Sequence, residues 1–386
     1  GAAGLEKALD TVLSGTGENS SLVCAVTAQG TLRTGETARL LQADSGALGV
    51  QLTISRPVQR AVEAVAASTM TSGCILVLDT ATAAVRASVS VPCYDPENLA
   101  DSLQAENSPF LNRALQSYAV GSVFKPVLAA AALEAGLQPV FECTGAVVVD
   151  GQIFRCAGGV PHGQVDLAAA LEKSCNGYFI RLGQQLGAES LLDAAKAFGF
   201  GQSLPLAEGF AAEAGQLPTP QELAQSGQLA NFSFGQGSLL AAPMQVAALF
   251  NTLAADGVYR APYVLQATLD ETTGQPVETL SHPRGRRVIS AQNAALLRAM
   301  LVQVVQQGTA QDAAGLSGGA GGKTGTAQTG QFTPEGTERC NLWFAGFWPA
   351  EKPRYTIVVL QDGAVHTAYS GAAIFAQVCT ALEAAG

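Results

Sequence analysis

The chain has 386 residues, of which 48% are hydrophobic and only 13% are charged, and its formal net charge is −10. This composition is typical of a globular protein with a large core and argues against long disordered tails. The net negative charge argues against nucleic acid as a partner, because a phosphate backbone would be repelled. No stretch reaches the roughly 18 uninterrupted apolar residues of a membrane-spanning helix.

The first part of the chain, Gly1 to Gln51, is rich in Gly, Ser, Thr and Ala and has only weak strand patterns such as SLVCAVTA. It has the composition of a linker or of the end of another module. A helix is predicted from Ser55, which can cap it, with Pro57 in the first turn and valines on one face. The run GCILVLDTATAAVRASVSV then predicts a β-hairpin, because two β-rich halves surround a short turn.

The centre of the chain is predicted to be helical and its end to return to strands. The predicted helices are Ser122–Ala135, Leu167–Leu186, Ser190–Phe198, Pro243–Ala255, Ala291–Gln306 and Ala372–Glu383. Strands are predicted around GGKTGTAQ, NLWFAGFWP and RYTIVVLQD, before the last helix. This order favours an α+β domain whose sheet contains strands from both ends of the chain.

The first of these helices carries a candidate nucleophile. Ser122 and Lys125 are three residues apart, so their side chains are neighbours on one face of a helix. A serine hydroxyl becomes an effective nucleophile when a base takes its proton, and lysine is such a base when apolar surroundings lower its pKa. The apolar run after Lys125 provides those surroundings. Taken alone, the Ser-x-x-Lys pattern more often marks a capping serine followed by a lysine that extends to the surface.

Two further motifs occur downstream, each pattern once in the chain. Ser174 and Asn176 form Ser-x-Asn, and Lys323 begins the strand-like run Lys-Thr-Gly-Thr. The three motifs, in this order, resemble those of the penicillin-binding protein and serine β-lactamase superfamily, whose active sites combine Ser-x-x-Lys, Ser-x-Asn and Lys-Thr-Gly.

The resemblance and the chemistry of the side chains together suggest their roles. Ser122 is expected to attack a peptide carbonyl and form an acyl-enzyme, with Lys125 accepting its proton. Ser174 is expected to relay a proton to the leaving amine, and Asn176 to hold the substrate amide or Lys125. The positive charge of Lys323 favours a neutral Lys125.

The third motif is also expected to bind substrate. Lys323 attracts a substrate carboxylate, to which Thr324 and Thr326 offer hydroxyl groups. Gly325 is expected to let the substrate lie close to the strand. By resemblance, the backbone N–H groups of Ser122 and Thr326 form the oxyanion hole.

Much more of the chain resembles one branch of this superfamily. Stretches such as HGQVDLAAALEKSCNGYFIRLGQQLG are similar to the transpeptidase domain of class B penicillin-binding proteins, of the elongation or sporulation type. The resemblance covers Leu52 to Gly386 and includes Asp95-Pro96 and the run Gly235–Gly237. It implies the penicillin-binding transpeptidase fold, an antiparallel sheet flanked by helices with an all-helical subdomain.

Residues 52–386 are therefore expected to form a transpeptidase domain. We interpret residues 1–51 as the remnant of the non-catalytic region that class B proteins carry, behind a membrane anchor, before this domain. The resemblance implies a location at the extracytoplasmic face of the bacterial cell membrane. Contacts with the cell-wall synthesis machinery would belong to the missing N-terminal region.

The resemblance implies a serine-type D-Ala-D-Ala transpeptidase that cross-links peptidoglycan stem peptides and is acylated by β-lactam antibiotics. One alternative is hydrolysis, as in a DD-carboxypeptidase or a β-lactamase, where water takes the acyl group. Another is a β-lactam sensor domain, which is acylated without turnover. Class A β-lactamases are shorter and place their motifs closer together.

No cofactor is expected for the chemistry, but four residues between the first two motifs have the spacing of a metal site. Cys143, Cys156, His162 and Cys175 follow the pattern C-x12-C-x5-H-x12-C, and three thiolates with one imidazole form a closed structural Zn²⁺ shell. This arrangement resembles the zinc site of some elongation-type relatives, in which two of the four ligands are carboxylates. A Cys143–Cys156 disulfide, with Cys175 buried as a small apolar residue, is the alternative, and free thiols are a third.

Overall fold

The computed structural model describes residues 4–15, 21–41, 46–105, 107–282 and 284–385. Of the N-terminal segment expected to be a remnant, residues 1–3, 16–20 and 42–45 lie outside the described residues. Two compact units are distinguished. The larger comprises Ile54–Leu204, Ala211–Tyr263 and Pro283–Gly386, and the smaller comprises Gly1–Thr53, Pro205–Phe210 and Val264–His282. Among the described residues, no helix is long and apolar enough to span a bilayer.

The smaller unit is built from the N-terminal segment and one distant stretch of the chain. Its elements are α1 (Gly4–Ala8), α2 (Asp10–Ser14), β1 (Ser21–Val23), β2 (Arg39–Leu41), β3 (Leu48–Leu52), β15 (Leu265–Asp270) and β16 (Pro276–Thr279). β1 pairs with β2, and a three-stranded antiparallel sheet has the order β16-β15-β3. The sequence patterns gave no sign of the pairing between β3 and β15.

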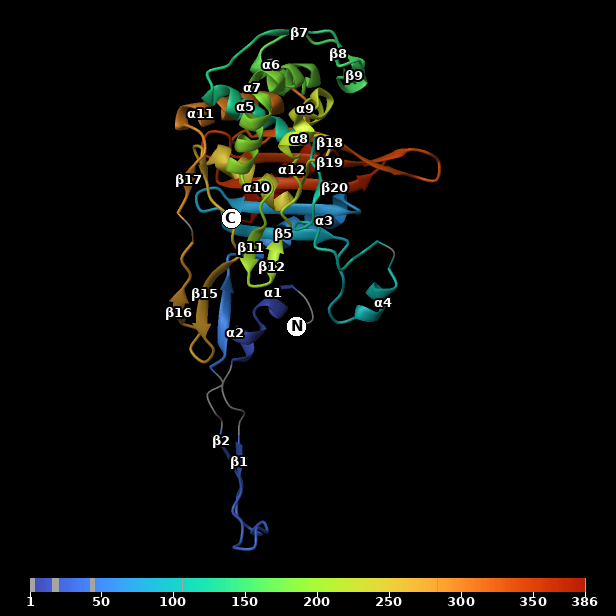
Figure 1. Ribbon diagram of the computed structural model, residues 1–386. Coiled ribbons are helices and arrows are strands. Elements are labelled where there is room, and N and C mark those ends of the chain that lie inside the picture. Colours follow the sequence, from blue (N-terminus) through green and yellow to red (C-terminus); the bar gives the residue numbers. More distant parts are fainter. Residues whose placement is uncertain (1–3, 16–20, 42–45, 106, 283, 386) are drawn as a thin grey trace. The chain divides into compact units, whose positions relative to one another are not determined.

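The larger unit has a five-stranded antiparallel sheet in the order β18-β19-β20-β4-β5. Its strands are β4 (Gly73–Asp79), β5 (Val85–Val91), β18 (Gly321–Phe332), β19 (Glu338–Trp348) and β20 (Tyr355–Ala364). In Figure 1 the blue strands β4 and β5 continue the sheet formed by the red strands β18 to β20. The predicted hairpin, the three predicted C-terminal strands and the sheet joining both chain ends are confirmed, as is the α+β class.

Several helices pack on this sheet. α10 (Pro243–Ala254) lies against β4, β19 and β20, and all its residues are buried, including the polar Gln245, Asn251 and Thr252. α3 (Arg56–Thr69) and α12 (Gly371–Ala384) pack against each other, and α3 also contacts β4 and β5 while α12 contacts β19 and β20. Phe375 of α12 meets Phe344 of β19 with ring centroids 4.7 Å apart.

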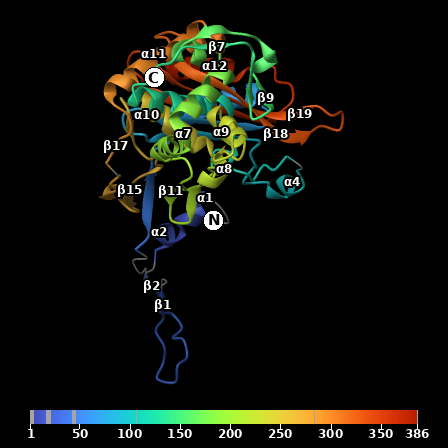
Figure 2. The ribbon, with the colours of Figure 1, turned by 45° about the horizontal axis from the view of Figure 1, so that its top comes forward.

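The remaining elements of this unit form a helical part and short strand pairs. The helices are η1 (Gly121–Phe124, a 3-10 turn), α4 (Leu99–Leu103), α5 (Lys125–Glu134), α6 (Leu167–Glu172), α7 (Asn176–Ala197), α8 (Pro220–Leu223), α9 (Ser226–Ser233) and α11 (Ala291–Gln306), with 3-10 turns η2 (Ala157–Gly159) and η3 (Gln311–Ala313). The short strands are β6 (Tyr118–Ala119), β7 (Phe141–Cys143), β8 (Ala146–Val149), β9 (Gln152–Arg155), β10 (Gly163–Val165), β13 (Leu240–Ala241), β14 (Val258–Tyr259) and β17 (Arg286–Arg287). Two further strands, β11 (Leu204–Ala207) and β12 (Phe210–Ala212), pair with each other. α7 packs on α5 and α9, as Figure 2 shows.

The predicted central helices need one correction. The single helix predicted over Leu167–Leu186 is wrong, because the chain breaks between α6 and α7 at Ser174, whose φ is +53°. The separation predicted before Ser190 is confirmed, since Gly187 (φ +80°, ψ +162°) is non-helical and divides α7 into two helical segments. The prediction for Ala291–Gln306 is confirmed at both ends.

Candidate active site

The Ser122 motif lies on a tight turn supported by a distant backbone segment. The helix predicted from Ser122 begins as the 3-10 turn η1, and α5 starts at Lys125. The N–H of Gly121 donates a hydrogen bond to the carbonyl of Gly235 at 2.8 Å. A Cβ atom on Gly235 would lie 1.9 Å from the Gly121 oxygen, so only glycine fits there. The Gly-Gln-Gly run thus holds the turn that carries Ser122.

Lys125 connects the first motif to the second. Its side chain is completely buried, and Nζ donates to the Ser174 carbonyl at 2.7 Å, to Ser174 Oγ at 3.1 Å and to Asn176 Oδ1 at 2.7 Å. Burial lowers the pKa of Lys125 to about 7, against the opposite influence of nearby Cys175 and Cys156. A lysine in this state exchanges a proton readily near neutral pH.

The second motif owes its geometry to the break between α6 and α7. Ser174 adopts a left-handed conformation, which directs its side chain and its carbonyl to the same Lys125 amine. Asn176 is the first residue of α7, and its amide nitrogen donates to the Arg155 carbonyl at 2.9 Å. Both ends of the Asn176 amide are therefore engaged, so its orientation is fixed from two sides.

The third motif lies beside the Ser122 turn. β18 contacts η1, and a Cβ atom on Gly121 would lie 2.6 Å from the Thr326 carbonyl oxygen. A Cβ atom on Gly325 would lie 3.0 Å from Val123 Cγ1, so the space that glycine leaves is filled by the turn rather than kept open for a ligand. The glycine is thus required by the close packing of strand and turn.

The side chains of this strand alternate between core and solvent. Lys323 is completely buried, and its Nζ donates to the Thr324 carbonyl at 3.1 Å. Burial first, and then the nearby Lys125 amine, hold the pKa of Lys323 well below its usual range. Thr324 is half-buried and Thr326 is exposed, and both lie on the opposite side of the strand from Gly325. The structure thus brings all three motifs together.

Three residues of this region escaped the sequence analysis or received no role there. Gly235 supports the nucleophile turn, the Arg155 carbonyl orients Asn176, and Thr309 Oγ1 lies 2.6 Å from Thr324 Oγ1. The Gly-Gln-Gly pattern gave a signal for the first. A backbone carbonyl and a single threonine after a helix carry no pattern that a sequence could reveal.

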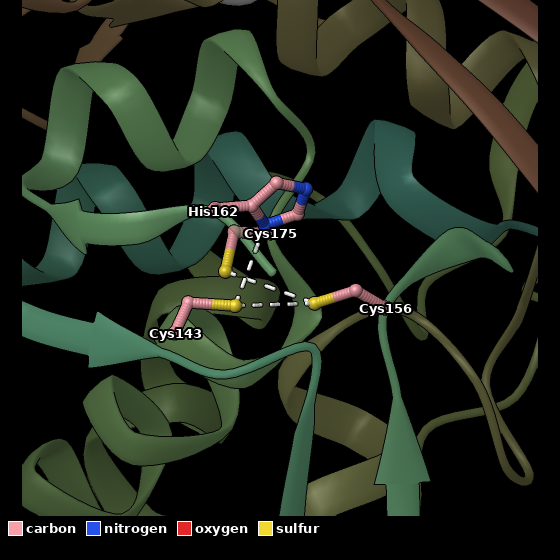
Figure 3. A group of neighbouring side chains, drawn as sticks. All are labelled: Cys143, Cys156, His162 and Cys175. Carbon is pink, nitrogen blue, oxygen red and sulfur yellow. Dashed lines mark hydrogen bonds between the residues drawn. The ribbon is translucent and has the colours of Figure 1, made fainter. Parts of the chain in front are cut away.

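The four residues with metal-ligand spacing form one cluster (Figure 3). Cys143 Sγ lies 3.6 Å from Cys156 Sγ and 3.4 Å from His162 Nδ1, and Cys156 Sγ lies 3.8 Å from Cys175 Sγ. One ligand atom of each residue lies within 4.8 Å of all the others. The three thiols are buried and the imidazole is half-buried. The hydrogen bond from Cys175 lowers the pKa of Cys156, so this thiol readily becomes a thiolate.

This cluster adjoins the second motif directly. Cys175 stands between Ser174 and Asn176, and its Sγ accepts a hydrogen bond from the Tyr178 N–H at the start of α7. Cys156 follows Arg155, whose carbonyl holds Asn176. Any group that fixes these thiols therefore also fixes the polar side chains around Lys125.

Comparisons with known proteins agree with this geometry. Residues 73–380 match the family described as penicillin binding protein transpeptidase domain. The chain is 32% identical over 364 residues to peptidoglycan D,D-transpeptidase PbpA of Mycolicibacterium smegmatis, in an alignment that covers 87% of this chain and 72% of that protein.

Solved structures give the same result. The D,D-transpeptidase domain of a peptidoglycan glycosyltransferase from Eggerthella lenta superposes with a TM-score of 0.82 at 25% identity, covering 100% of this chain and 88% of that one. Penicillin-binding protein A of M. tuberculosis, as its penicillin G acyl-enzyme complex, has a TM-score of 0.79 at 26% identity, covering 99% and 88%. The chain therefore belongs to the penicillin-binding protein transpeptidase family, as a class B member.

Proposed function

We propose that this chain is a peptidoglycan D,D-transpeptidase that cross-links stem peptides through an acyl-enzyme on Ser122, and that β-lactams acylate the same serine. The main observation behind this proposal is the buried Lys125 amine, which is hydrogen-bonded to Ser174 and Asn176 and whose pKa is lowered to about 7. The names of its relatives and the penicillin G acyl-enzyme of a neighbour support the substrate class.

The hydrogen bonds of Lys125 suit a base. A neutral amine has two N–H groups and one lone pair. The Ser174 carbonyl and Asn176 Oδ1, each at 2.7 Å, accept the two hydrogens. The lone pair then remains for a hydroxyl proton, from Ser122 during attack or from Ser174 during the relay.

Acylation then proceeds in a balanced sequence. Ser122 Oγ forms a bond to the penultimate D-Ala carbonyl carbon as its proton moves to Lys125 Nζ. The peptide C–N bond breaks, and the departing D-Ala amine receives a proton through Ser174. In the second half, the amine of another stem peptide attacks the ester, gives up a proton along the same route and releases Ser122. Water in place of the amine would give hydrolysis.

The third motif supplies binding and charge stabilisation. A bound substrate carboxylate would favour the charged form of Lys323, which lies beneath the strand, while Thr324 and Thr326 offer that carboxylate hydroxyl groups on the solvent side. Gly325 contributes through its backbone, since Val123 fills the space beside it. The N–H groups of Ser122 and Thr326 are proposed to stabilise the oxyanion, which is typically worth about 3–4 kcal/mol of barrier.

We also propose that Cys143, Cys156, His162 and Cys175 hold a structural Zn²⁺. A tetrahedral site with Zn–S of about 2.3 Å and Zn–N of about 2.0 Å has S···S edges of about 3.8 Å and S···N edges of about 3.5 Å. The distances of 3.6, 3.8 and 3.4 Å support this geometry, whereas a disulfide would need about 2.05 Å. The metal would brace the second motif and take no part in the chemistry.

We also propose a domain division and a location. Residues 52–386 would form the transpeptidase domain and residues 1–51 would belong to a non-catalytic region. A peptidoglycan substrate requires work at the extracytoplasmic face of the bacterial cell membrane, where the cell-wall synthesis machinery would be the partner.

The test is a fluorescent penicillin label followed by a peptide assay. The parent protein and the control Ser68→Ala, which changes an exposed hydroxyl on α3, should be labelled, and Ser122→Ala should not. A stem-peptide mimic with an amine acceptor should then yield the cross-linked product by mass spectrometry. Label on Ser122→Ala would remove the serine from its role. Rapid release of the drug would favour a hydrolase, and a stable label without peptide turnover would favour a sensor.

A further inference from the structure

We propose that Thr309 is a positioning and specificity residue of the carboxylate site, which acts through Thr324 to favour substrates with a free carboxylate. The inference rests on the proposed function. The observation behind it is the 2.6 Å hydrogen bond between Thr309 Oγ1 and Thr324 Oγ1. It joins a threonine outside the three motifs to the hydroxyl that follows Lys323.

The backbone around Thr309 lies between the second and third motifs and contacts the segments that carry both. Thr309 follows the end of α11, and its N–H donates to the Glu172 carbonyl at 3.3 Å, two residues before Ser174. A Cβ atom on Gly308 would lie 2.5 Å from that same carbonyl, so the close approach needs glycine. The Gly308–Thr309 turn therefore binds the end of α6 through its backbone and β18 through its side chain.

The polarity of the hydrogen bonds gives Thr309 its role. The Lys323 amine donates to Thr324 Oγ1 at 3.4 Å, so this oxygen acts as an acceptor there. Its own hydrogen must point elsewhere, to Thr309 or to a ligand. When a substrate carboxylate accepts the Thr324 hydrogen, the hydrogen bond between the two threonines can reverse, so that the Thr309 hydroxyl donates to Thr324 Oγ1. Thr309 thus holds the Thr324 hydroxyl in one rotamer both with and without substrate.

This arrangement predicts an effect that depends on the ligand's charge. A carboxylate accepts strong hydrogen bonds from hydroxyl groups, whereas an ester in its place accepts weaker ones. Losing the Thr309 hydroxyl should therefore weaken binding of a free acid much more than binding of its ester. A merely structural role would impair both ligands equally.

The experiment measures acylation of Ser122 by benzylpenicillin and by its methyl ester, resolved into a binding constant and a limiting rate. For the free acid, Thr309→Val should weaken binding about tenfold with the limiting rate unchanged, and Thr309→Ser should remain within about twofold of the parent. For the ester, all variants should bind within about twofold of the parent. Thr380→Val, which removes an exposed hydroxyl on α12, is the matched control.

Thr309→Ala provides a second variant should valine disturb folding, which thermal melting will reveal. Equal losses for acid and ester, or no loss for either, would overturn the role of Thr309 while leaving Ser122 acylation intact. Failure of benzylpenicillin to acylate the parent protein would overturn the proposed function itself, and the inference with it.

Discussion

Gly121 and Gly235 are bonded through their backbones, with the N–H of the first 2.8 Å from the carbonyl oxygen of the second. Gly235 has a φ of +88°, and a Cβ atom there would lie 1.9 Å from the Gly121 oxygen. Since Ser122 follows Gly121 directly, the position of the nucleophile depends on a contact between two segments that are far apart in the sequence.

Gly235→Ala should therefore reduce acylation of Ser122 by penicillin about 100-fold, because a displacement of about 1 Å at a reacting atom has that effect. Gly136→Ala is the matched control. Gly136 also has a positive φ, of +68°, but a Cβ atom there would meet no other atom within 4 Å. This variant should lose only about 1–2 kcal/mol of stability and keep its acylation rate. Equal acylation by the two variants would show that the contact does not position Ser122.

The sequence predicted much of this fold where its patterns were long. The apolar helix at Pro243 and the amphipathic helix at Ala291 appear within one residue of their expected ends. The strands that form the sheet were also found, since runs such as YTIVVLQ are too β-rich for another structure. Long periodic segments specify their own conformation, so tertiary contacts did not need to be known.

The sequence-based predictions failed where tertiary contacts override the local conformational preference of the chain. Ser174 adopts a φ of +53°, which serine rarely does alone, and the hydrogen bonds to Lys125 account for this break in a helical sequence. Thr309 was missed because its hydrogen-bond partner, Thr324, lies on a strand fifteen residues further along the chain. The motif residues could be singled out because they lie in short, ordered patterns, and the structure brings these patterns together.

The rate of acylation should rise with pH through about 7. The neutral form of Lys125 takes the Ser122 proton, and its pKa is lowered to about 7, so the neutral fraction falls nearly tenfold for each pH unit below that value. Acylation at pH 5 should thus be about 100-fold slower than on the plateau above pH 8. Lys125→Arg, which stays protonated, should be inactive throughout. A rate that stays constant from pH 5 to 8 would contradict the role of Lys125.

The purified protein should contain one zinc ion per chain, and all eight cysteines should react as thiols after denaturation. A strong chelator should lower the melting temperature by about 4 °C or more, because the metal binds only the folded state. Cys143→Ser should lose the metal, while Cys340→Ser, outside the cluster, should retain it. Six reactive thiols and no bound metal would instead support the Cys143–Cys156 disulfide. Eight reactive thiols and no bound metal would show that the four residues of the cluster bind nothing and that its cysteines are free thiols.

Asn176→Ala should slow acylation about 100-fold with little loss of stability. The substitution removes the 2.7 Å bond that orients Lys125 Nζ and frees the Arg155 carbonyl, so the amine no longer presents its lone pair in one direction. Asn293→Ala is the control. It removes a similar 2.6 Å side-chain hydrogen bond, to Glu134 on α5, without touching a motif. If Asn293→Ala slowed acylation as much as Asn176→Ala, the loss would reflect general loosening of the helical part. If only Asn176→Ala is slow, the amide acts by orienting the base.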